Sequence, residues 1–223
     1  MLSFKKLYLV AYNAIEVIGW SLVFYILVSH YGDNTSTLSL WDKIWLPLTV
    51  IQYSAYLEII HSMIGLVKSN LYVTFAQVSS RLVLILVLFS LPWDFVGSSL
   101  CLPYTVLSWS ITEILRYLYY LLNILSFVPK FLTWLRYSTF LVLYPTGISG
   151  ELWCIYYAIV YSMSHPELWS YALPNPWNFT FSYLYFLISL VLLYIPGSFI
   201  LYFHMLSQRK KILGTKVAVK KVK

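Results

Sequence analysis

The chain alternates between long apolar runs and short polar breaks. Six apolar runs reach the length of about 20 residues that a helix needs to cross a bilayer. They lie near Leu7–Ser29, Trp45–Val67, Tyr72–Leu91, Leu100–Leu125, Tyr137–Ser162 and Phe179–Leu206. The breaks between them hold turn-forming and polar residues, for example Gly32-Asp33-Asn34, Lys68-Ser69-Asn70 and Pro129-Lys130. This pattern predicts an all-α bundle of six transmembrane helices.

The composition favours the same fold class. The 223 residues are 60% hydrophobic and 10% charged, whereas about 25% of an ordinary globular domain is charged. The mean hydropathy is +0.74, and a soluble core of this size could not hide so many apolar side chains. We therefore expect a polytopic membrane protein, with residues 1–206 forming the transmembrane domain and residues 207–223 a basic cytosolic tail.

Basic residues are distributed unevenly about the predicted spans. If the N-terminus is cytosolic, twelve lysines and arginines fall on that side, Lys43 alone falls on the other, and Arg81 and Arg116 lie within spans. This positive-inside bias places both termini in the cytosol. The net charge of +7 is then explained by orientation and lipid contact, and we expect no nucleic-acid partner. The far side holds both glycosylation sequons, at Asn34 and Asn178, and an expected aromatic belt of Trp41, Trp45, Trp93, Trp169 and Trp177.

The C-terminus reads Lys220-Lys221-Val222-Lys223. Lysines at the third and fourth positions from a cytosolic end resemble a di-lysine signal for retrieval to the endoplasmic reticulum. The alternative is a basic juxtamembrane tail that is attracted to anionic lipid. We expect the endoplasmic reticulum membrane.

Several polar side chains interrupt the predicted spans at a similar depth, in the cytosolic half or near the midplane: Glu16, Glu58, Gln77, Arg81, Glu113, Arg116, Tyr144 and Glu151. Ionisable groups at membrane depth are costly to bury and commonly functional. Their shared depth predicts one water-accessible pocket that opens toward the cytosol.

The charges within the spans do not balance, since four glutamates face two arginines. Glu113 and Arg116 are three residues apart on one helix and can pair, and Glu58 is expected to reach Arg81 across helices. We expect at least one protonated glutamate, with Glu16 and Glu151 as the candidates. The alternatives are that the paired residues only hold helices together, and that Glu16 faces a near-surface cavity or lipid headgroups.

The segment Leu135–Glu151 is the most informative stretch of the chain. Tyr144 and Glu151 are seven residues apart, so on a helix they project from nearly the same face and can converge on one substrate. Pro145 frees a backbone carbonyl. Gly147 and Gly150 allow a close approach, either by a ligand or by a tightly packed helix.

The segment LRYSTFLVLYPTGISGEL is similar to the signature of the very-long-chain (3R)-3-hydroxyacyl-CoA dehydratases, membrane proteins also called tyrosine-phosphatase-like. Further matching stretches occur in order along almost the whole chain: YNAIEVIGWS, LEIIHSMIGLVKS, TFAQVSSRL, WSITEILRYLYY, YIPG and HMLSQRKK. The resemblance implies that Tyr144 and Glu151 are catalytic. It also implies functional roles for Glu58, Gln77, Arg81, Arg116, Arg136 and Gly147.

The implied reaction is the loss of water from a 3-hydroxyacyl-CoA to give the trans-2-enoyl-CoA in fatty-acid elongation, a hydro-lyase reaction. It needs a base for the C2 proton and a proton for the departing hydroxyl, and we expect no metal or other cofactor. Helical depth places Tyr144 nearer the thioester and Glu151 nearer the C3 hydroxyl as proton donor. Because a phenol of unperturbed pKa ≈ 10 is a poor base, Tyr144 needs a nearby arginine, or the roles are reversed. Basic residues such as Arg136 and Lys130 are expected to hold the CoA headgroup, and other elongation-cycle enzymes, the condensing enzyme and the reductases, are expected partners.

Phosphatase chemistry does not fit this sequence. A cysteine phosphatase needs an arginine six residues after its cysteine, but Leu107 and Val160 stand six residues after Cys101 and Cys154. The two cysteines form no disulfide framework and have no metal-ligand spacing, so we expect both to be small buried residues. Two other function classes remain open. A small membrane transporter would move its substrate unchanged, and a non-catalytic adaptor would leave acyl-CoA unaltered.

Overall fold

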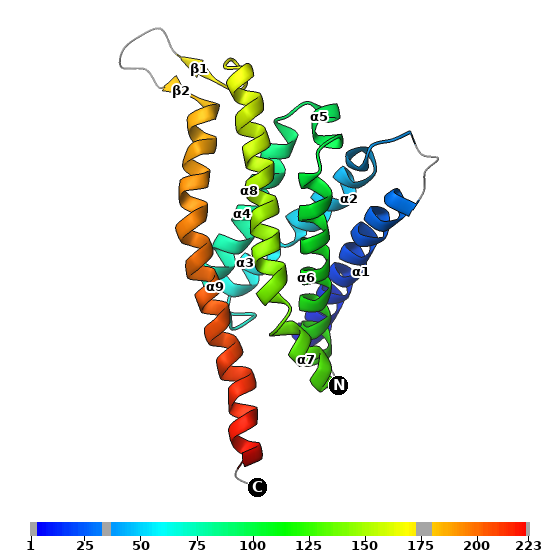
Figure 1. The fold of residues 1–223 in the computed structure, drawn as a ribbon. Helices are drawn as coiled ribbons and strands as arrows, with labels where there is room; N and C mark the ends of the chain where they lie inside the picture. The colour runs from blue at the N-terminus through cyan, green and yellow to red at the C-terminus, as the bar shows by residue number, and fades with distance from the viewer. Residues whose placement is uncertain (1–3, 33–36, 173–179, 222–223) are drawn as a thin grey trace.

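The computed structural model describes residues 4–32, 37–172 and 180–221. Within them the chain is almost wholly helical (Figure 1), which confirms the all-α prediction. The helices are α1 Phe4–Gly32, α2 Leu40–Ser54, α3 Tyr56–Met63, α4 Leu71–Phe89, α5 Trp93–Gly97, α6 Cys101–Ile124, α7 Lys130–Arg136, α8 Phe140–Ser164 and α9 Tyr183–Lys221. Between α8 and α9, β1 Tyr171–Ala172 pairs antiparallel with β2 Thr180–Phe181, with Tyr171 opposite Phe181.

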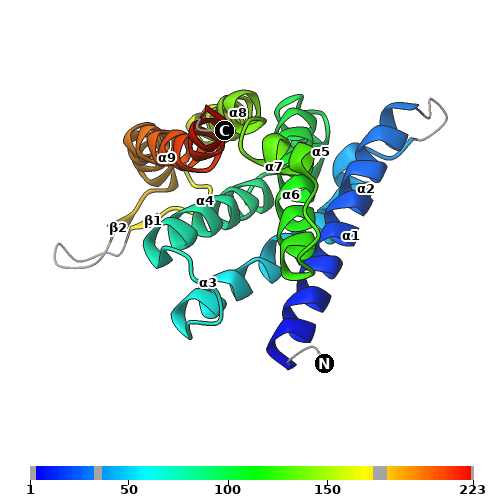
Figure 2. The same ribbon diagram turned by 90° about the horizontal axis from the view of Figure 1, so that it is seen from below.

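The helix α6 lies at the centre of the bundle. It packs against α1 on one side and against α8 on the other, while α9 packs on the outer side of α8 (Figure 2). The core of buried side chains runs through α1, α2, α4, α6 and α8 and includes Trp20, Trp41, Ile85, Leu102 and Ile155. The start of α1 and the end of α9 lie at the same end of the bundle, and the β1–β2 hairpin lies at the opposite end (Figure 1).

The predicted spans agree with the helices to different degrees. The first, third, fourth and fifth predicted spans each match one helix: α1, α4, α6 and α8. The last predicted span begins close to the start of α9, but α9 continues beyond the predicted end at Leu206. The prediction of one helix over Trp45–Val67 was wrong, because the chain turns at Ala55 and divides the region into α2 and α3. Pro129 begins the short helix α7, which the sequence pattern did not predict.

Three helices among the described residues are both long and apolar enough to cross a membrane: α1, α4 and the part of α9 up to Gly214. The helices α6 and α8, of 24 and 25 residues, have the required length but are more polar. Their polar side chains include Glu113 and Glu151, which are buried inside the bundle. Large apolar side chains cover much of the outer surface, among them Leu192, Leu193 and Ile200 of α9, as expected for a protein in lipid.

The start of α2 is fixed by a capping box. Ser39 accepts a hydrogen bond from the Asp42 backbone N–H, and the Asp42 carboxylate accepts one from the Ser39 N–H. The Trp93 indole N–H, from α5, also donates to Asp42. These hydrogen bonds lower the pKa of Asp42, and the largest contribution comes from the Ser39 side chain. Through Asp42, the start of α2 is therefore hydrogen-bonded to α5.

The predicted aromatic belt is only partly present. Trp41 is fully buried, and Trp45 and Trp93 pack with it and Phe89 in one aromatic cluster, whereas Trp169 is exposed. Trp41 is therefore a core residue, because the first turn of α2 packs against α5. Trp177 and the sequon asparagines Asn34 and Asn178 lie outside the described residues, as does the end of the di-lysine sequence.

Candidate active site

A cavity of about 690 Å³ lies between α4, α6, α8 and α9. Its wall includes Lys68, which precedes α4, Arg136 at the end of α7 and Gln208 of α9, together with Trp109 of α6 and Glu151 of α8. The helix α7 lies at the end of the bundle that holds the start of α1 (Figure 1). Of the polar residues singled out from the sequence, the following line it: Gln77, Arg81, Glu113, Arg116, Arg136, Tyr144, Gly147 and Glu151. Six of the eight residues expected to share one pocket therefore line one cavity, whereas Glu58 lines the second cavity described below and Glu16 lines neither.

Tyr144 and Glu151 lie on the same wall of this cavity, two turns apart on α8. The Tyr144 hydroxyl donates to the Ser198 carbonyl oxygen of α9 at 3.0 Å. Glu151 accepts the Trp109 indole N–H on Oε1 at 2.7 Å and the Tyr194 hydroxyl on Oε2 at 2.8 Å. Both side chains line the same cavity. A residue of α9 bonds each of them, and α6 supplies a further bond to Glu151.

One face of α9 contacts both Tyr144 and Glu151. Tyr194, Ser198 and Tyr202 follow one another at intervals of four residues, so they form one stripe along the helix. Tyr194 bonds Glu151, Ser198 bonds Tyr144, and the Tyr202 ring stacks on the Tyr144 ring with centroids 5.8 Å apart. The polar face of α8 therefore meets a complementary stripe on α9.

The charged residues next to this site form one network. Arg116 donates to both carboxylate oxygens of Glu58, at 2.9 and 2.7 Å, and also to Glu113. Glu113 in turn pairs with Arg81, and the Tyr117 hydroxyl donates to Glu58. Two carboxylates and two guanidinium groups thus neutralise one another in the interior, which a buried charge requires.

The pairing expected from the sequence was right for Glu113 with Arg116 and wrong for Glu58 with Arg81. Glu58 pairs with Arg116, and Arg81 pairs with Glu113. The packing brings Glu58 of α3 to Arg116, whereas Arg81 of α4 meets Glu113, about one turn earlier on α6. The bidentate geometry of Arg116 with Glu58 is the arrangement that a guanidinium prefers.

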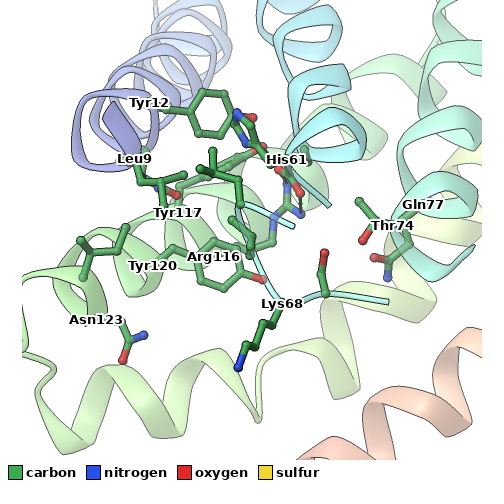
Figure 3. A pocket seen from close by; sticks show the side chains of 16 residues that line it. Leu9, Tyr12, His61, Lys68, Thr74, Gln77, Arg116, Tyr117, Tyr120 and Asn123 are labelled. Carbon is green, nitrogen blue, oxygen red and sulfur yellow. Dashed lines mark hydrogen bonds and ion pairs between the residues drawn. The ribbon is translucent and has the colours of Figure 1, made fainter. Parts of the chain in front are cut away.

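Glu58 and the network border a second cavity of about 330 Å³, between α1, α3, α4 and α6. Figure 3 shows Leu9 and Tyr12 of α1 on one side of it and Thr74 and Gln77 of α4 on the other. His61 lies in its wall, 2.8 Å from the Tyr8 hydroxyl. The second cavity shares part of its wall with the first: Lys68, Ser69, Thr74, Gln77, Arg116 and Tyr120.

The two glycines of the central segment have different surroundings. A Cβ atom at Gly150 would lie 2.5 Å from Thr105 Oγ1 and 3.2 Å from the Thr105 Cα, so Gly150 allows α8 to pack closely on α6. A Cβ atom at Gly147 would meet only Ser108 Cβ, at 3.7 Å, and Gly147 lines the cavity. Helix packing therefore explains Gly150 but not Gly147.

Glu16 does not face the surface or either cavity. It is fully buried, accepts the Ser54 hydroxyl on Oε1 at 2.5 Å, and has no hydrogen-bond partner for Oε2 among the residues that the structure describes. The alternative that it faces a near-surface cavity or lipid headgroups is wrong, because α2 packs on this face of α1. Among the described residues Glu16 forms no ion pair, so it stays a candidate for the neutral acid.

Comparison with known proteins identifies the family. Residues 52–215 match the family model described as "Protein tyrosine phosphatase-like protein, PTPLA". The chain belongs to this family. No solved structure matches the chain.

Curated relatives match 93–94% of the length of the chain. The chain is 40% identical over 213 residues to the very-long-chain (3R)-3-hydroxyacyl-CoA dehydratase PASTICCINO 2A of Oryza sativa subsp. japonica, covering 94% of each chain. It is 42% identical over 207 residues to the human very-long-chain (3R)-3-hydroxyacyl-CoA dehydratase 2, covering 93% of this chain and 81% of the human one. The dehydratase hpo-8 of Caenorhabditis elegans is 38% identical over 208 residues. These proteins are all named as dehydratases, as the sequence resemblance implied.

The cysteines of this PTPLA family member are buried, as expected. Cys101 and Cys154 are 2% and 1% exposed, and the Cys154 thiol lies 3.7 Å from Thr105 Oγ1. A phosphatase nucleophile must instead be a reachable thiolate in an electropositive loop. The family's description therefore does not correspond to cysteine phosphatase chemistry in this chain.

Sequence reasoning did not single out Trp109, Tyr194 or Ser198. Trp109 begins the stretch WSITEILRYLYY and Tyr194 begins YIPG, two of the stretches that carry the family resemblance. The available signal was the four-residue interval of Tyr194, Ser198 and Tyr202 in an otherwise apolar helix. That interval shows which residues share a face of α9, but only the packing shows that this face meets α8.

Proposed function

We propose that this protein removes water from very-long-chain (3R)-3-hydroxyacyl-CoA to give trans-2-enoyl-CoA, as a hydro-lyase of fatty-acid elongation. The observation that carries the proposal is the placement of Tyr144 and Glu151 on one wall of one cavity, in a chain whose relatives are named as these dehydratases. A phenol and a carboxyl group that reach the same substrate supply both proton transfers of a dehydration.

The hydrogen bonds favour a particular division of roles between the two groups. Glu151 accepts a hydrogen bond on each oxygen, as a carboxylate does, so we assign it as the base that takes the C2 proton. Tyr144 is a hydrogen-bond donor, so its proton goes to the departing hydroxyl. This division reverses the roles expected from helical depth, because Tyr144 holds its proton and cannot serve as the base.

In this mechanism the C2–H bond breaks, its electron pair forms the C2=C3 double bond, and the C3–O bond breaks. The hydroxyl leaves as water with the proton from Tyr144. Before the next turnover, the proton taken up by Glu151 returns to Tyr144 through the cavity, so the protein is unchanged. The Arg81 guanidinium, which also lines the cavity, favours negative charge on the substrate during the reaction.

The mouth of the cavity suits the CoA headgroup. Arg136 and Lys68 line it, and both can bind phosphate groups. Lys130 is exposed on α7 and is not in the wall, so Lys68 takes the place that the sequence suggested for Lys130. Gln77 lines both cavities and can orient the substrate. The half-buried apolar side chains of Leu143 and Leu190, which also line the cavity, suit the acyl chain.

We further propose six membrane spans, formed by α1, α2 with α3, α4, α6, α8 and α9, with both termini cytosolic. The start of α1 and the end of α9 lie at one end of the bundle, which supports this topology. The basic C-terminal sequence supports residence in the endoplasmic reticulum membrane, with residues 207–223 as a cytosolic tail. There the product would pass to a reductase, and the substrate would come from the preceding reductase of the cycle.

The test uses the purified protein, 3-hydroxyacyl-CoA and detection of the enoyl product by mass spectrometry. Wild type should form the enoyl product. Tyr144→Phe and Glu151→Gln should fold and bind acyl-CoA but lose at least about 100-fold in kcat. Matched controls are Tyr104→Phe, whose hydroxyl contacts Ser149 outside the cavity, and Glu167→Gln in an exposed turn.

Three results would overturn the proposal. Near-normal turnover in either site variant would remove that residue from the chemistry. Substrate flux into liposomes without chemical change would indicate a transporter. Unaltered acyl-CoA at high protein concentration, without flux, would indicate a non-catalytic adaptor.

A further inference from the structure

The Glu151 carboxyl group is held by two neutral donors from two different helices. Trp109 of α6 donates to Oε1 at 2.7 Å, and Tyr194 of α9 donates to Oε2 at 2.8 Å. Trp109 is 3% exposed and Glu151 is 7% exposed, so little water competes for these bonds. Neither donor has a role in the reaction proposed above.

The distances indicate which acceptor each of the two donors prefers. An indole N–H can only donate, so Oε1 must accept. The Tyr194 oxygen is 2.8 Å from Glu151 Oε2 but 3.3 Å from the Ser80 carbonyl oxygen. Since hydroxyl hydrogen bonds are normally about 2.5–3.0 Å long, the Tyr194 hydroxyl donates to Glu151 in preference to Ser80. Both carboxyl oxygens therefore accept hydrogen bonds, and the ionised form of Glu151 satisfies every group present.

The donors also fix the direction of the carboxylate. With one donor from α6 and one from α9, the plane of the carboxyl group cannot rotate without breaking a bond. The Arg81 guanidinium lies over the Trp109 ring, 5.7 Å from its centroid, which keeps that indole in place. Arg81 does not itself form an ion pair with Glu151 within the described residues, so the two neutral donors are the direct partners.

We propose that Tyr194 and Trp109 are positioning residues of the dehydration: they hold the Glu151 carboxylate ionised and aimed into the cavity. The inference rests on the proposed function, since it assigns the support for the base of that reaction. It assigns Tyr194, not Tyr144, as the phenol in direct contact with Glu151, while the Tyr144 hydroxyl, which bonds the Ser198 carbonyl oxygen instead, serves the substrate. Glu16, with one hydrogen bond and no ion pair, is then the buried carboxyl that fits the neutral form.

A positioning role predicts a change in the pH dependence of the rate. The titratable or charged groups that face Glu151 are Arg81 on α4, Tyr194 on α9, and Tyr144 and Cys154 on α8 itself. A donor to a carboxylate favours the charged form. Its loss should therefore move the acidic limb of the kcat/KM profile to higher pH, a shift that a purely structural defect would not cause.

The test compares Tyr194→Phe and Trp109→Phe with wild type. Each variant should lose about 10- to 100-fold in kcat at neutral pH, with a smaller change in KM and the acidic limb moved to higher pH. The matched controls are Tyr183→Phe, on the same helix with its hydroxyl against Ser90, and Trp41→Phe, whose buried indole N–H has no hydrogen-bond partner in the described part of the chain. Both controls should keep the wild-type profile.

Infrared difference spectra of wild type minus Glu151→Gln give a readout that does not depend on activity. They should show an ionised carboxylate in wild type and a protonated carboxyl group when the same difference is taken in the Tyr194→Phe background. Wild-type kcat and pH profile in both variants, or a protonated Glu151 in wild type, would overturn the inference. An inactive wild type with the expected spectra would instead overturn the proposed function alone.

Discussion

Gly150 and Glu151 are neighbours on α8 but face different partners. Gly150 faces α6, where the Thr105 backbone leaves no room for a side chain, and Glu151 faces the cavity. Gly150 thus allows α8 to pack closely on α6, and this close packing places Glu151 within reach of Trp109 on α6. Gly147, one turn earlier, faces the cavity from the same helix with space beside it.

This difference predicts opposite outcomes for two alanine substitutions. Gly150→Ala should destabilise the protein by about 1–3 kcal/mol, because the new methyl group meets backbone and side-chain atoms that cannot move far. Gly147→Ala should leave the stability unchanged or raise it by up to about 1 kcal/mol, since alanine favours the helix. Its KM should rise, because the methyl group enters the cavity.

Thermal unfolding in nanodiscs and steady-state kinetics on the same preparations measure both effects. Equal losses of stability at the two positions would contradict the assignment of Gly150 to packing and Gly147 to the cavity.

At the scale of elements, the boundaries of the helices depend on a few local contacts. Gly65 takes a left-handed conformation, with φ +69, after α3, which only glycine adopts without strain. The following N–H of Leu66 donates back to the His61 carbonyl at 2.8 Å. At α2 the Ser39–Asp42 capping box and the bond from Trp93 define the first turn.

The capping box predicts a pH-dependent stability. Hydrogen bonds lower the pKa of Asp42 in the folded protein, so its contribution is fully present above the unfolded value of about 3.9 and is lost as the pH falls through the folded value. Asp42→Asn should therefore lower Tm at neutral pH, and the difference from wild type should shrink as the pH falls through the lowered folded pKa of Asp42.

The measurement is thermal unfolding across this pH range. Asp94→Asn, in the exposed first turn of α5, is the control and should not show the same pH-dependent difference. A constant Tm deficit for Asp42→Asn at every pH would mean that the charge plays no part.

At the scale of the whole molecule, polar and apolar groups are separated as a bilayer requires. The outer faces of α1 and α9 expose large apolar side chains, including Ile18, Tyr25, Leu193 and Phe203. The charged network and the site residues lie between the helices, where they satisfy one another or line a cavity. Burying these ionisable groups against lipid would be far more costly.

The proposed topology predicts the labelling of single engineered cysteines in sealed vesicles with the cytosolic face outward. Lys6→Cys and Gln208→Cys, near the two ends of the chain, should react with a membrane-impermeant maleimide. Tyr171→Cys, in the hairpin at the other end of the bundle, should react only after permeabilisation. The native cysteines provide the background control, because both are buried. Labelling of Tyr171→Cys in intact vesicles would contradict the topology.

The sequence by itself determined the membrane class, most helix positions, and the common face of Tyr144 and Glu151, because these follow from the apolar pattern and the fixed repeat of one helix. It also gave the pairing of Glu113 with Arg116, which needs only neighbouring turns. The tertiary structure alone decided the contacts between helices: Glu58 with Arg116, the burial of Glu16 under α2, and the donors Trp109 and Tyr194 on Glu151. Such contacts depend on how each helix is rotated and offset against its neighbour, and many side chains packed together set that arrangement.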